Sequence, residues 1–177
     1  MTAEWNAMPL PAVVVPAAIP GELAAAARAR LERAEYKRYA LLDRGSYEEL
    51  AGPEERELLA ALVALARKVT GRSLEVAEIR ALRLRPGDYL LVRHDRVHDD
   101  RPVELVLDLS ASSVPDAEVH YRHRGQVFFT FPSAPGALAI VERGPTVMCN
   151  HTYVSKLHAN ASVLRLVVLL RDQAPRG

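Results

Sequence analysis

The pattern of hydrophobic and polar positions changes once along the chain, near residue 73. Before this point, apolar residues recur at steps of three and four in two stretches, which is typical of amphipathic helices. After it, short apolar or alternating runs are separated by residues that favour turns, which is the pattern of β-strands. The sequence therefore predicts a helical preface followed by a β-rich core.

Two helices are predicted in the preface, within residues 20–39 and 52–71. The second has clear end signals, because Pro53 suits a first helical turn and Gly71 suits a helix end. Glutamates follow Pro53 and basic residues precede Gly71, so the charges complement the helix dipole. The segment between the helices, residues 41–50, is predicted to be a loop with at most one helical turn.

Eight short strands are predicted in the second part, and several of them alternate apolar and polar residues. In "VELVLDLS", for example, Val103 and Leu105 share one face while Glu104 and Asp108 lie on the other. Eight strands after a helical preface predict an α+β, mainly β fold: a jelly roll braced by helices on one outer face. Another β-sandwich is the alternative. The predicted strands are residues 74–85, 89–95, 103–110, 118–124, 126–132, 137–143, 146–155 and 162–171.

The length of 177 residues is that of one domain. We therefore expect a single domain over residues 1–177, with a helical preface (1–73), a jelly-roll core (74–171) and a tail (172–177). The formal net charge of +1 gives no reason to expect nucleic acid or an anionic membrane as a partner. No apolar run approaches the ~18 residues of a membrane span.

Cys149 is the single cysteine, so an intramolecular disulfide and a cysteine-based zinc site are both excluded. The first 20 residues place an acidic residue before their apolar stretch, and prolines interrupt that stretch. They therefore do not match a signal peptide, and we expect a cytoplasmic protein.

Two of the six histidines stand out by their position in the predicted strand order. His94 ends the second strand and His151 lies in the seventh, and these strands are neighbours in a jelly roll. Their side chains can therefore meet inside the barrel mouth. Two histidines and a carboxylate form a facial triad that holds Fe(II) and leaves positions for oxygen and a cosubstrate. We expect surface or loop positions for three other histidines, namely His120, His123 and His158.

Arg165 lies in the middle of the nearly all-apolar segment "SVLRLVVLLR". A charge there is costly if it is buried without a partner. Either the guanidinium faces inward and holds a carboxylate in a bidentate fork, or it faces solvent on the outer side of the strand. Both interpretations stay open from the sequence.

The segments "RLRPGDYLLVRHD", "VELVLDLS", "PGALAIVERG" and "HTYVS", followed by an arginine in the last strand, resemble a known family. They are similar to the 2-oxoglutarate- and Fe(II)-dependent dioxygenases, especially the small prolyl-hydroxylase-like branch. The resemblance covers roughly residues 20 to 171. It implies a double-stranded β-helix, the jelly roll of that family.

The resemblance also implies roles for individual residues. His94 and His151 match the two metal-binding histidines, and Arg165 matches the basic residue that binds the distal carboxylate of 2-oxoglutarate. Tyr89 and Tyr121 are candidates for a supporting hydroxyl. The implied cofactors are Fe(II) and 2-oxoglutarate.

The chain departs from the family pattern at the metal-binding carboxylate. The residue two positions after His94 is Arg96, where the family has aspartate or glutamate. Asp95 is the preferred replacement, because a bulge at the strand end re-aims a side chain. A site without a carboxylate ligand also stays open. The alternatives to Asp95 as the metal-binding carboxylate are Asp99 or Asp100 from the loop. A further alternative is that His98 and Asp100 form the metal-binding motif.

The expected function is an oxygenase that hydroxylates an unactivated C–H bond of a small amino-acid-like or peptidyl substrate. The expected partner is that small molecule or peptide, and the sequence does not indicate an oligomeric state. Two alternatives remain: a catalytically degenerate jelly roll that binds a ligand, or a cupin-like metal protein that uses no 2-oxoglutarate.

Overall fold

The computed structural model describes residues 2–42, 45–92, 95 and 98–174, and within them the chain forms three helices and eleven strands. The helices are α1 (Thr2–Ala7), α2 (Gly21–Arg33) and α3 (Arg56–Thr70). The strands are β1 (Ala12–Val15), β2 (Lys37–Leu41), β3 (Gly45–Ala51), β4 (Leu74–Leu84), β5 (Tyr89–Leu90), β6 (Val103–Asp108), β7 (Glu118–His123), β8 (Gln126–Pro132), β9 (Leu138–Glu142), β10 (Val147–His151) and β11 (Val163–Asp172).

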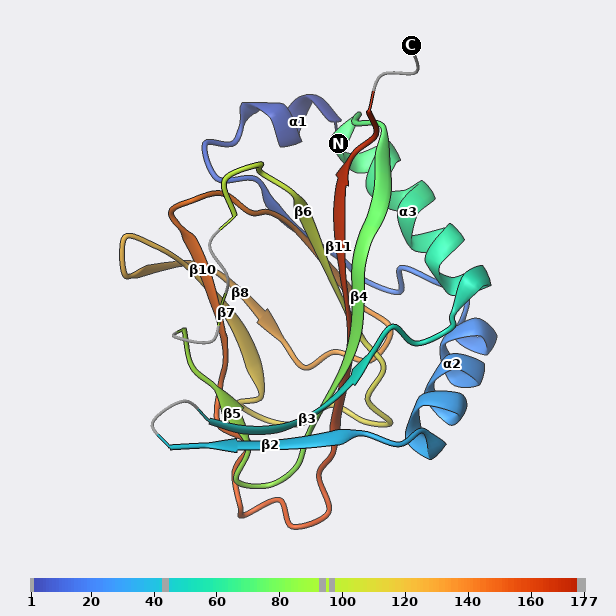
Figure 1. The fold of residues 1–177 in the computed structure, drawn as a ribbon, viewed down its shortest axis with the longest axis vertical. Helices are drawn as coiled ribbons and strands as arrows, with labels where there is room; N and C mark the ends of the chain where they lie inside the picture. Colours follow the sequence, from blue (N-terminus) through green and yellow to red (C-terminus); the bar gives the residue numbers. More distant parts are fainter. Residues whose placement is uncertain (1, 43–44, 93–94, 96–97, 175–177) are drawn as a thin grey trace.

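The strands form a nearly closed antiparallel jelly roll, as the sequence predicts (Figure 1). One sheet has the order β1-β9-β6-β11-β4, and the other has the order β5-β10-β7-β8. Strand β3 joins the two sheets. Its residues Glu48–Ala51 pair with β4, and its residues Gly45–Ser46 pair with β5. The interior between the sheets is therefore closed on this side by continuous strand pairing.

Gly45 is required where β3 meets β5. Its φ is +115°, and a Cβ on this residue would lie 2.1 Å from the carbonyl oxygen of Tyr89. That distance is far inside van der Waals contact, and the backbone conformation is one that other residues rarely adopt. Glycine therefore permits the crossing from one sheet to the other.

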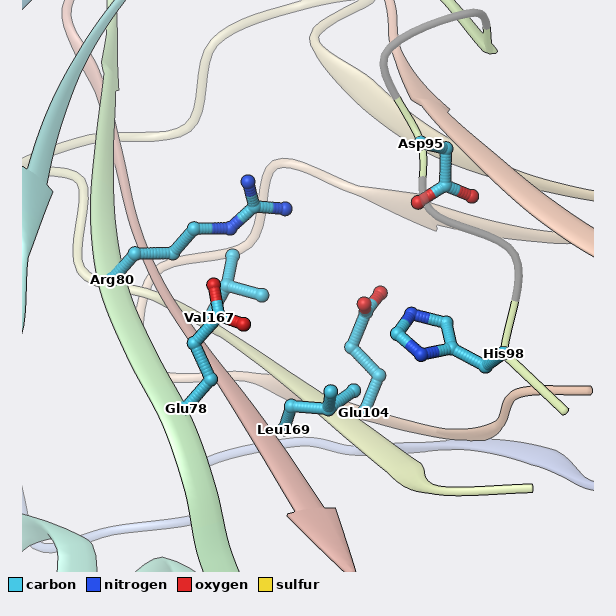
Figure 2. Close-up of a pocket in the computed structure, with 7 residues that line it drawn as sticks. All are labelled: Glu78, Arg80, Asp95, His98, Glu104, Val167 and Leu169. Atoms are coloured by element: carbon cyan, nitrogen blue, oxygen red, sulfur yellow. The ribbon is translucent and has the colours of Figure 1, made fainter. Parts of the chain in front are cut away.

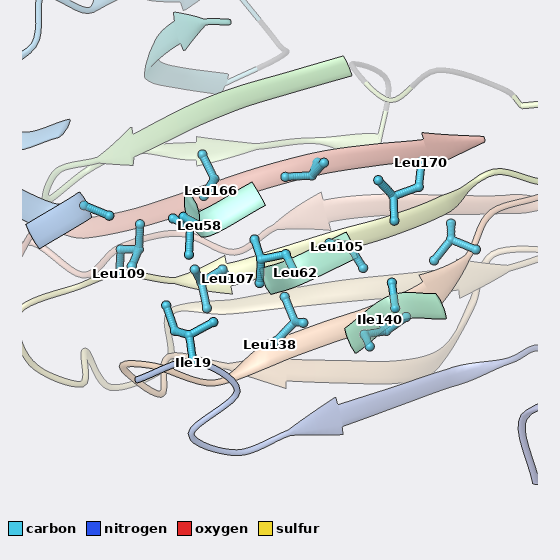
Figure 3. Packing of buried hydrophobic residues seen from close by; sticks show 14 of the residues in the cluster. Ile19, Leu58, Leu62, Leu105, Leu107, Leu109, Leu138, Ile140, Leu166 and Leu170 are labelled. Carbon is cyan, nitrogen blue, oxygen red and sulfur yellow. The ribbon is translucent and has the colours of Figure 1, made fainter. Parts of the chain in front are cut away.

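The helices cover the outer face of the larger sheet, where the main apolar core lies (Figures 1 and 3). Leu58 and Leu62 of α3 pack with Leu105 and Leu107 of β6 and with Leu166 of β11. All five side chains are fully buried. Within the described residues, no helix combines the length and the apolar character needed to cross a membrane.

Strand β6 is buried on both faces, which explains how charged residues enter the interior. Its odd-numbered residues face the helices, so Glu104 and Asp108 face the space between the sheets. The register aligns three rows of residues across β6, β11 and β4 on this inner face. The rows are Glu104, Leu169 and Glu78; Val106, Val167 and Arg80; and Asp108, Arg165 and Leu82.

The preface is less helical than the sequence predicts. The helix expected within residues 20–39 ends at Arg33, and Lys37–Leu41 form β2 instead. Residues 41–50, expected as a loop, contain most of β3, and β1 is a further strand of the preface. Charged and polar residues occupy much of β2 and β3, so the sequence shows no clear alternation of apolar and polar positions there. β2 pairs with β3, and β3 pairs with β4 and β5. This pairing decides the conformation of both strands, because tertiary context overrides local propensity.

Replacing Leu62 by alanine should lower the free energy of unfolding by about 2–5 kcal/mol, because the buried side chain leaves a cavity between α3 and the sheet. Urea unfolding followed by circular dichroism measures the change. Leu157→Ala is the control, since Leu157 is 91% exposed and its loss should cost less than about 0.5 kcal/mol. Equal effects of the two substitutions would contradict this description of the core.

Candidate active site

A narrow pocket opens at one end of the interior between the sheets (Figure 2). Side chains of β4, β6 and β11 form one wall, and Asp95 and His98 lie opposite. Its volume is about 40 Å³, which is room for about three water molecules. The lining residues are Glu78, Arg80, Asp95, His98, Glu104, Val167 and Leu169.

His151 faces the interior from β10. This strand pairs with β5 through His151 and Leu90, so the second and seventh predicted strands are neighbours as expected. The side chain is 3% exposed. Burial lowers the pKa of His151 well below its ordinary value, and the positive charges of Arg165 and Arg80 lower it further. The imidazole is therefore neutral at pH 7.

Arg165 faces inward, so of the two interpretations left open by the sequence, the structure supports the buried one. The residue is 1% exposed. Its Nη1 donates to Nδ1 of His151 at 2.8 Å, and its Nη2 donates to the carbonyl oxygen of Ala117 at 2.8 Å. Within the described part of the chain, Nε has no hydrogen-bond partner and no carboxylate forms an ion pair with this guanidinium. Burial lowers the pKa of Arg165.

The contact with Arg165 fixes the tautomer of His151. A guanidinium can only donate, so Nδ1 of the neutral imidazole accepts and Nε2 carries the proton. A histidine that binds a metal through Nε2 needs the opposite tautomer, with a proton on Nδ1. Nε2 of His151 becomes available to a metal once Arg165 releases Nδ1.

A second buried guanidinium, Arg143, holds a cluster that the sequence analysis did not identify. Arg143 follows β9 and is fully buried. Its Nη1 donates to Oε2 of Glu104 at 2.7 Å, and its Nη2 forms an ion pair with Oδ2 of Asp95. The hydroxyl of Tyr121 donates to Oε1 of Glu104 at 2.7 Å. The alternation of residues in β6 could have indicated that Glu104 faces the interior. The segment "VERG" has no feature that indicates the buried position of Arg143.

Asp95 lies against β10, close to the middle of the strand. Its Oδ2 also accepts from the backbone N–H of Cys149 at 2.5 Å. Burial raises the pKa of Asp95 to about 6, and this effect exceeds the opposing charge of Arg143. The charge of Glu104 raises it further. Asp95 is therefore anchored two residues along β10 from His151.

The other candidates are placed as follows. His94 and Arg96 lie outside the described residues, so the first histidine of the proposed triad has no described position. Asp99 and Asp100 are exposed, and His98 lines the pocket. Tyr89 packs against Tyr153 with ring centroids 6.3 Å apart, whereas the Tyr121 hydroxyl is committed to Glu104.

The donor chemistry of the described candidates fits Fe(II), since His151 is a neutral imidazole and Asp95 is a carboxylate. Their present hydrogen bonds go to guanidinium groups, and no three described histidine, cysteine or acidic residues gather as a metal site. Binding of Fe(II) therefore requires that Arg165 first releases His151. The free Nε and the absence of a carboxylate partner in the described residues make Arg165 suited to a ligand carboxylate.

Comparison with known proteins places the fold. No family model matches the sequence, and no curated protein matches it closely enough to count as a relative. Solved structures do match. A prolyl-4-hydroxylase from Pseudomonas putida superposes with a TM-score of 0.75 at 17% identity, covering 98% of this chain and 100% of that one.

Two further structures extend the likeness. A 2OG-Fe(II) oxygenase family oxidoreductase from Burkholderia pseudomallei gives a TM-score of 0.72 at 14% identity, covering 93% of this chain and 88% of that one. HygX from Streptomyces hygroscopicus, solved with nickel and 2-oxoglutarate bound, gives 0.65 at 11% identity, covering 92% and 83%. The chain thus has the double-stranded β-helix fold of 2-oxoglutarate oxygenases, including prolyl hydroxylases.

Replacing Arg143 by glutamine should lower the free energy of unfolding by about 3–5 kcal/mol, because Asp95 and Glu104 would lose the charge that compensates them. Urea denaturation measures the loss. The matched control is Arg171→Gln, which removes an exposed ion pair with Glu75 and should cost less than about 1 kcal/mol. A loss no larger than that of the control would show that Arg143 does not hold the cluster.

The raised pKa of Asp95 predicts a pH-dependent stability. The folded protein holds this proton more tightly than the unfolded chain, so the contribution is present at low pH and is lost as pH rises through about 6. The stability difference between the wild type and Asp95→Asn should fall by on the order of 2–3 kcal/mol between about pH 4 and pH 6.5. Unfolding titrations across this range measure it, and a constant difference would contradict the assignment.

Proposed function

We propose that the protein is a 2-oxoglutarate- and Fe(II)-dependent oxygenase that hydroxylates an unactivated C–H bond of a small amino-acid-like or peptidyl substrate. The observation that carries the proposal is Arg165, a guanidinium buried between the sheets with no carboxylate partner in the described residues. A buried charge of this kind calls for a counter-ion. A carboxylate of 2-oxoglutarate supplies one, and the shared fold favours this cosubstrate.

The chain's own residues contribute binding and orientation. A carboxylate that arrives at Arg165 competes with His151 for Nη1. Once released, His151 can carry its proton on Nδ1 and present Nε2. His151, Asp95 and His94 would then hold Fe(II), which when bound supplies the activation of dioxygen. Arg143 keeps Asp95 in place through its ion pair.

The substrate would enter at the pocket in front of Asp95 (Figure 2). The narrow pocket suits a single side chain or a small molecule better than a bulky one. This size is the reason for proposing an amino-acid-like or peptidyl substrate.

A second candidate function is favoured by a specific observation, namely that guanidinium groups engage both described ligand candidates. In that case the protein binds a carboxylate ligand on the oxygenase fold and holds no iron. The first function requires the contact between Arg165 and His151 to open so that His151 can bind a metal ion, whereas the second requires only that a carboxylate reaches Arg165.

Succinate formation tests the first function. The protein is prepared without oxygen, loaded with Fe(II), and offered 2-oxoglutarate and a panel of amino acids and peptides in air. We expect succinate to form from 2-oxoglutarate, and substrates that fit the pocket to stimulate it. His151→Ala should abolish Fe(II) binding and turnover. His158→Ala is the control, because His158 lies in the loop that follows β10, does not line the pocket in front of Asp95, and should leave both unchanged.

The same preparation distinguishes the two functions. A visible absorption band on adding 2-oxoglutarate to the anaerobic Fe(II) protein supports the oxygenase. If no band forms and no succinate appears, while 2-oxoglutarate still raises the melting temperature of the metal-free protein, the binding function replaces it.

A further inference from the structure

Arg80 is a second basic residue on the inner face of the larger sheet, beside Arg165. In the register of β4 and β11, Arg165 lies opposite Leu82 and Arg80 lies opposite Val167. Residues two apart on a strand share a face, so the two arginines are diagonal neighbours, with Cα atoms about 7–8 Å apart. Their side chains therefore start from adjacent rows of the same interior wall.

The Arg80 guanidinium forms a long ion pair with Glu49, and Glu78 and Glu104 line the same pocket. Its Nη1 donates to Oε2 of Glu49 at 3.4 Å, which is long for a charged hydrogen bond, and no other side-chain hydrogen bond of this residue is found among the described residues. Figure 2 shows its guanidinium extending into the pocket toward the side where Asp95 lies.

Two of the three carboxylates that line the pocket are held by other groups. Glu104 accepts from the Tyr121 hydroxyl at Oε1 and from Arg143 at Oε2, and Asp95 accepts from Arg143 at Oδ2. Arg143 thus forms ion pairs with both carboxylates. Arg80 and Arg165 retain donors for further acceptors, Arg165 through its unpartnered Nε and Arg80 toward the pocket.

We propose that Arg80 and Arg165 together bind the two carboxylates of an open-chain dicarboxylate, and that this binding needs no metal ion. The deeper carboxylate lies at Arg165, and the other lies at Arg80 near the pocket. Two guanidinium forks from adjacent rows match two carboxylates better than a single anion, because each fork can donate two parallel hydrogen bonds. The proposal rests on the 2-oxoglutarate binding proposed above and adds Arg80 as the second anchor.

Isothermal titration of the full-length protein in EDTA tests the inference, with 2-oxoglutarate, glutarate and butyrate as ligands. Glutarate keeps both carboxylates but lacks the keto group that chelates metals, and butyrate keeps one carboxylate. We expect 2-oxoglutarate and glutarate to bind with similar affinity and butyrate to bind about 10- to 100-fold more weakly.

Substitutions assign the two carboxylates. Arg80→Gln should weaken both dicarboxylates by about 10- to 100-fold and leave butyrate unchanged, and Arg165→Gln should weaken all three ligands. Arg80→Lys keeps the charge and should give an intermediate loss. Arg85→Gln is the control, since Arg85 follows the same strand and is 56% exposed, and it should change nothing. Melting temperatures check that each variant folds.

The outcomes separate this inference from the proposed function. If butyrate binds as tightly as glutarate, or if Arg80→Gln leaves dicarboxylate binding unchanged, the inference is wrong. If 2-oxoglutarate binds only after Mn(II) is added, the metal-free inference fails while the oxygenase proposal stands. If 2-oxoglutarate binds neither with nor without Mn(II), both fail.

Discussion

The structure depends on how positive charge is accommodated between two closely packed sheets. Arg143 and Arg165 are both fully or almost fully buried, and a guanidinium cannot lose its proton to escape the cost. The chain solves this in two different ways. Arg143 is compensated by Asp95 and Glu104, whereas Arg165 is hydrogen-bonded to neutral groups only. The first arrangement is complete within the protein, and the second is open to an anion.

The charged groups of the interior therefore differ between the pocket and the deeper rows. Asp95 and Glu104 line the pocket and are held by Arg143, whereas Arg165 lies in a deeper row with Asp108 and Leu82. Asp108 lies opposite Arg165 and its charge acts on the guanidinium, but its oxygens accept hydrogen bonds from Ser133 and from the backbone of Ser110 and Ala134 instead. A ligand entering from the pocket therefore meets Arg143 with its two carboxylates first, and afterwards a guanidinium that has no ion-pair partner among the described residues.

Much of the fold could be predicted from the sequence, and the reasons are local. Turn residues and β-branched runs define the eight core strands. Gly71 ends the second helix in the left-handed conformation, as expected, whereas the helix begins at Arg56 and Pro53 precedes it instead of lying in its first turn. The hairpin of β2 and β3 could not be predicted in the same way. Its residues are charged and partly exposed, so their strand conformation comes from pairing with distant strands.

The site was predictable only in part. The strand order brought His151 beside β5, and the apolar surroundings of Arg165 indicated that its charge needed an explanation. Arg143 had no such signal, because its partners Asp95 and Glu104 are 48 and 39 residues away along the chain. An ion pair between distant residues leaves no periodic pattern in a sequence. Whether His94 completes a metal site stays a prediction, since it lies outside the described residues.

The crossing at Gly45 has a mechanical consequence. Because β3 is hydrogen-bonded to both sheets, they cannot move apart on that side without breaking ladder hydrogen bonds. The opposite edges, β1 and β8, end the strand order, and the described residues form no strand pairing between them. The two sheets are therefore joined along β3 and unjoined at β1 and β8. Any widening of the interior that admits a ligand to Arg165 begins at these two edges, because separating them breaks no strand pairing.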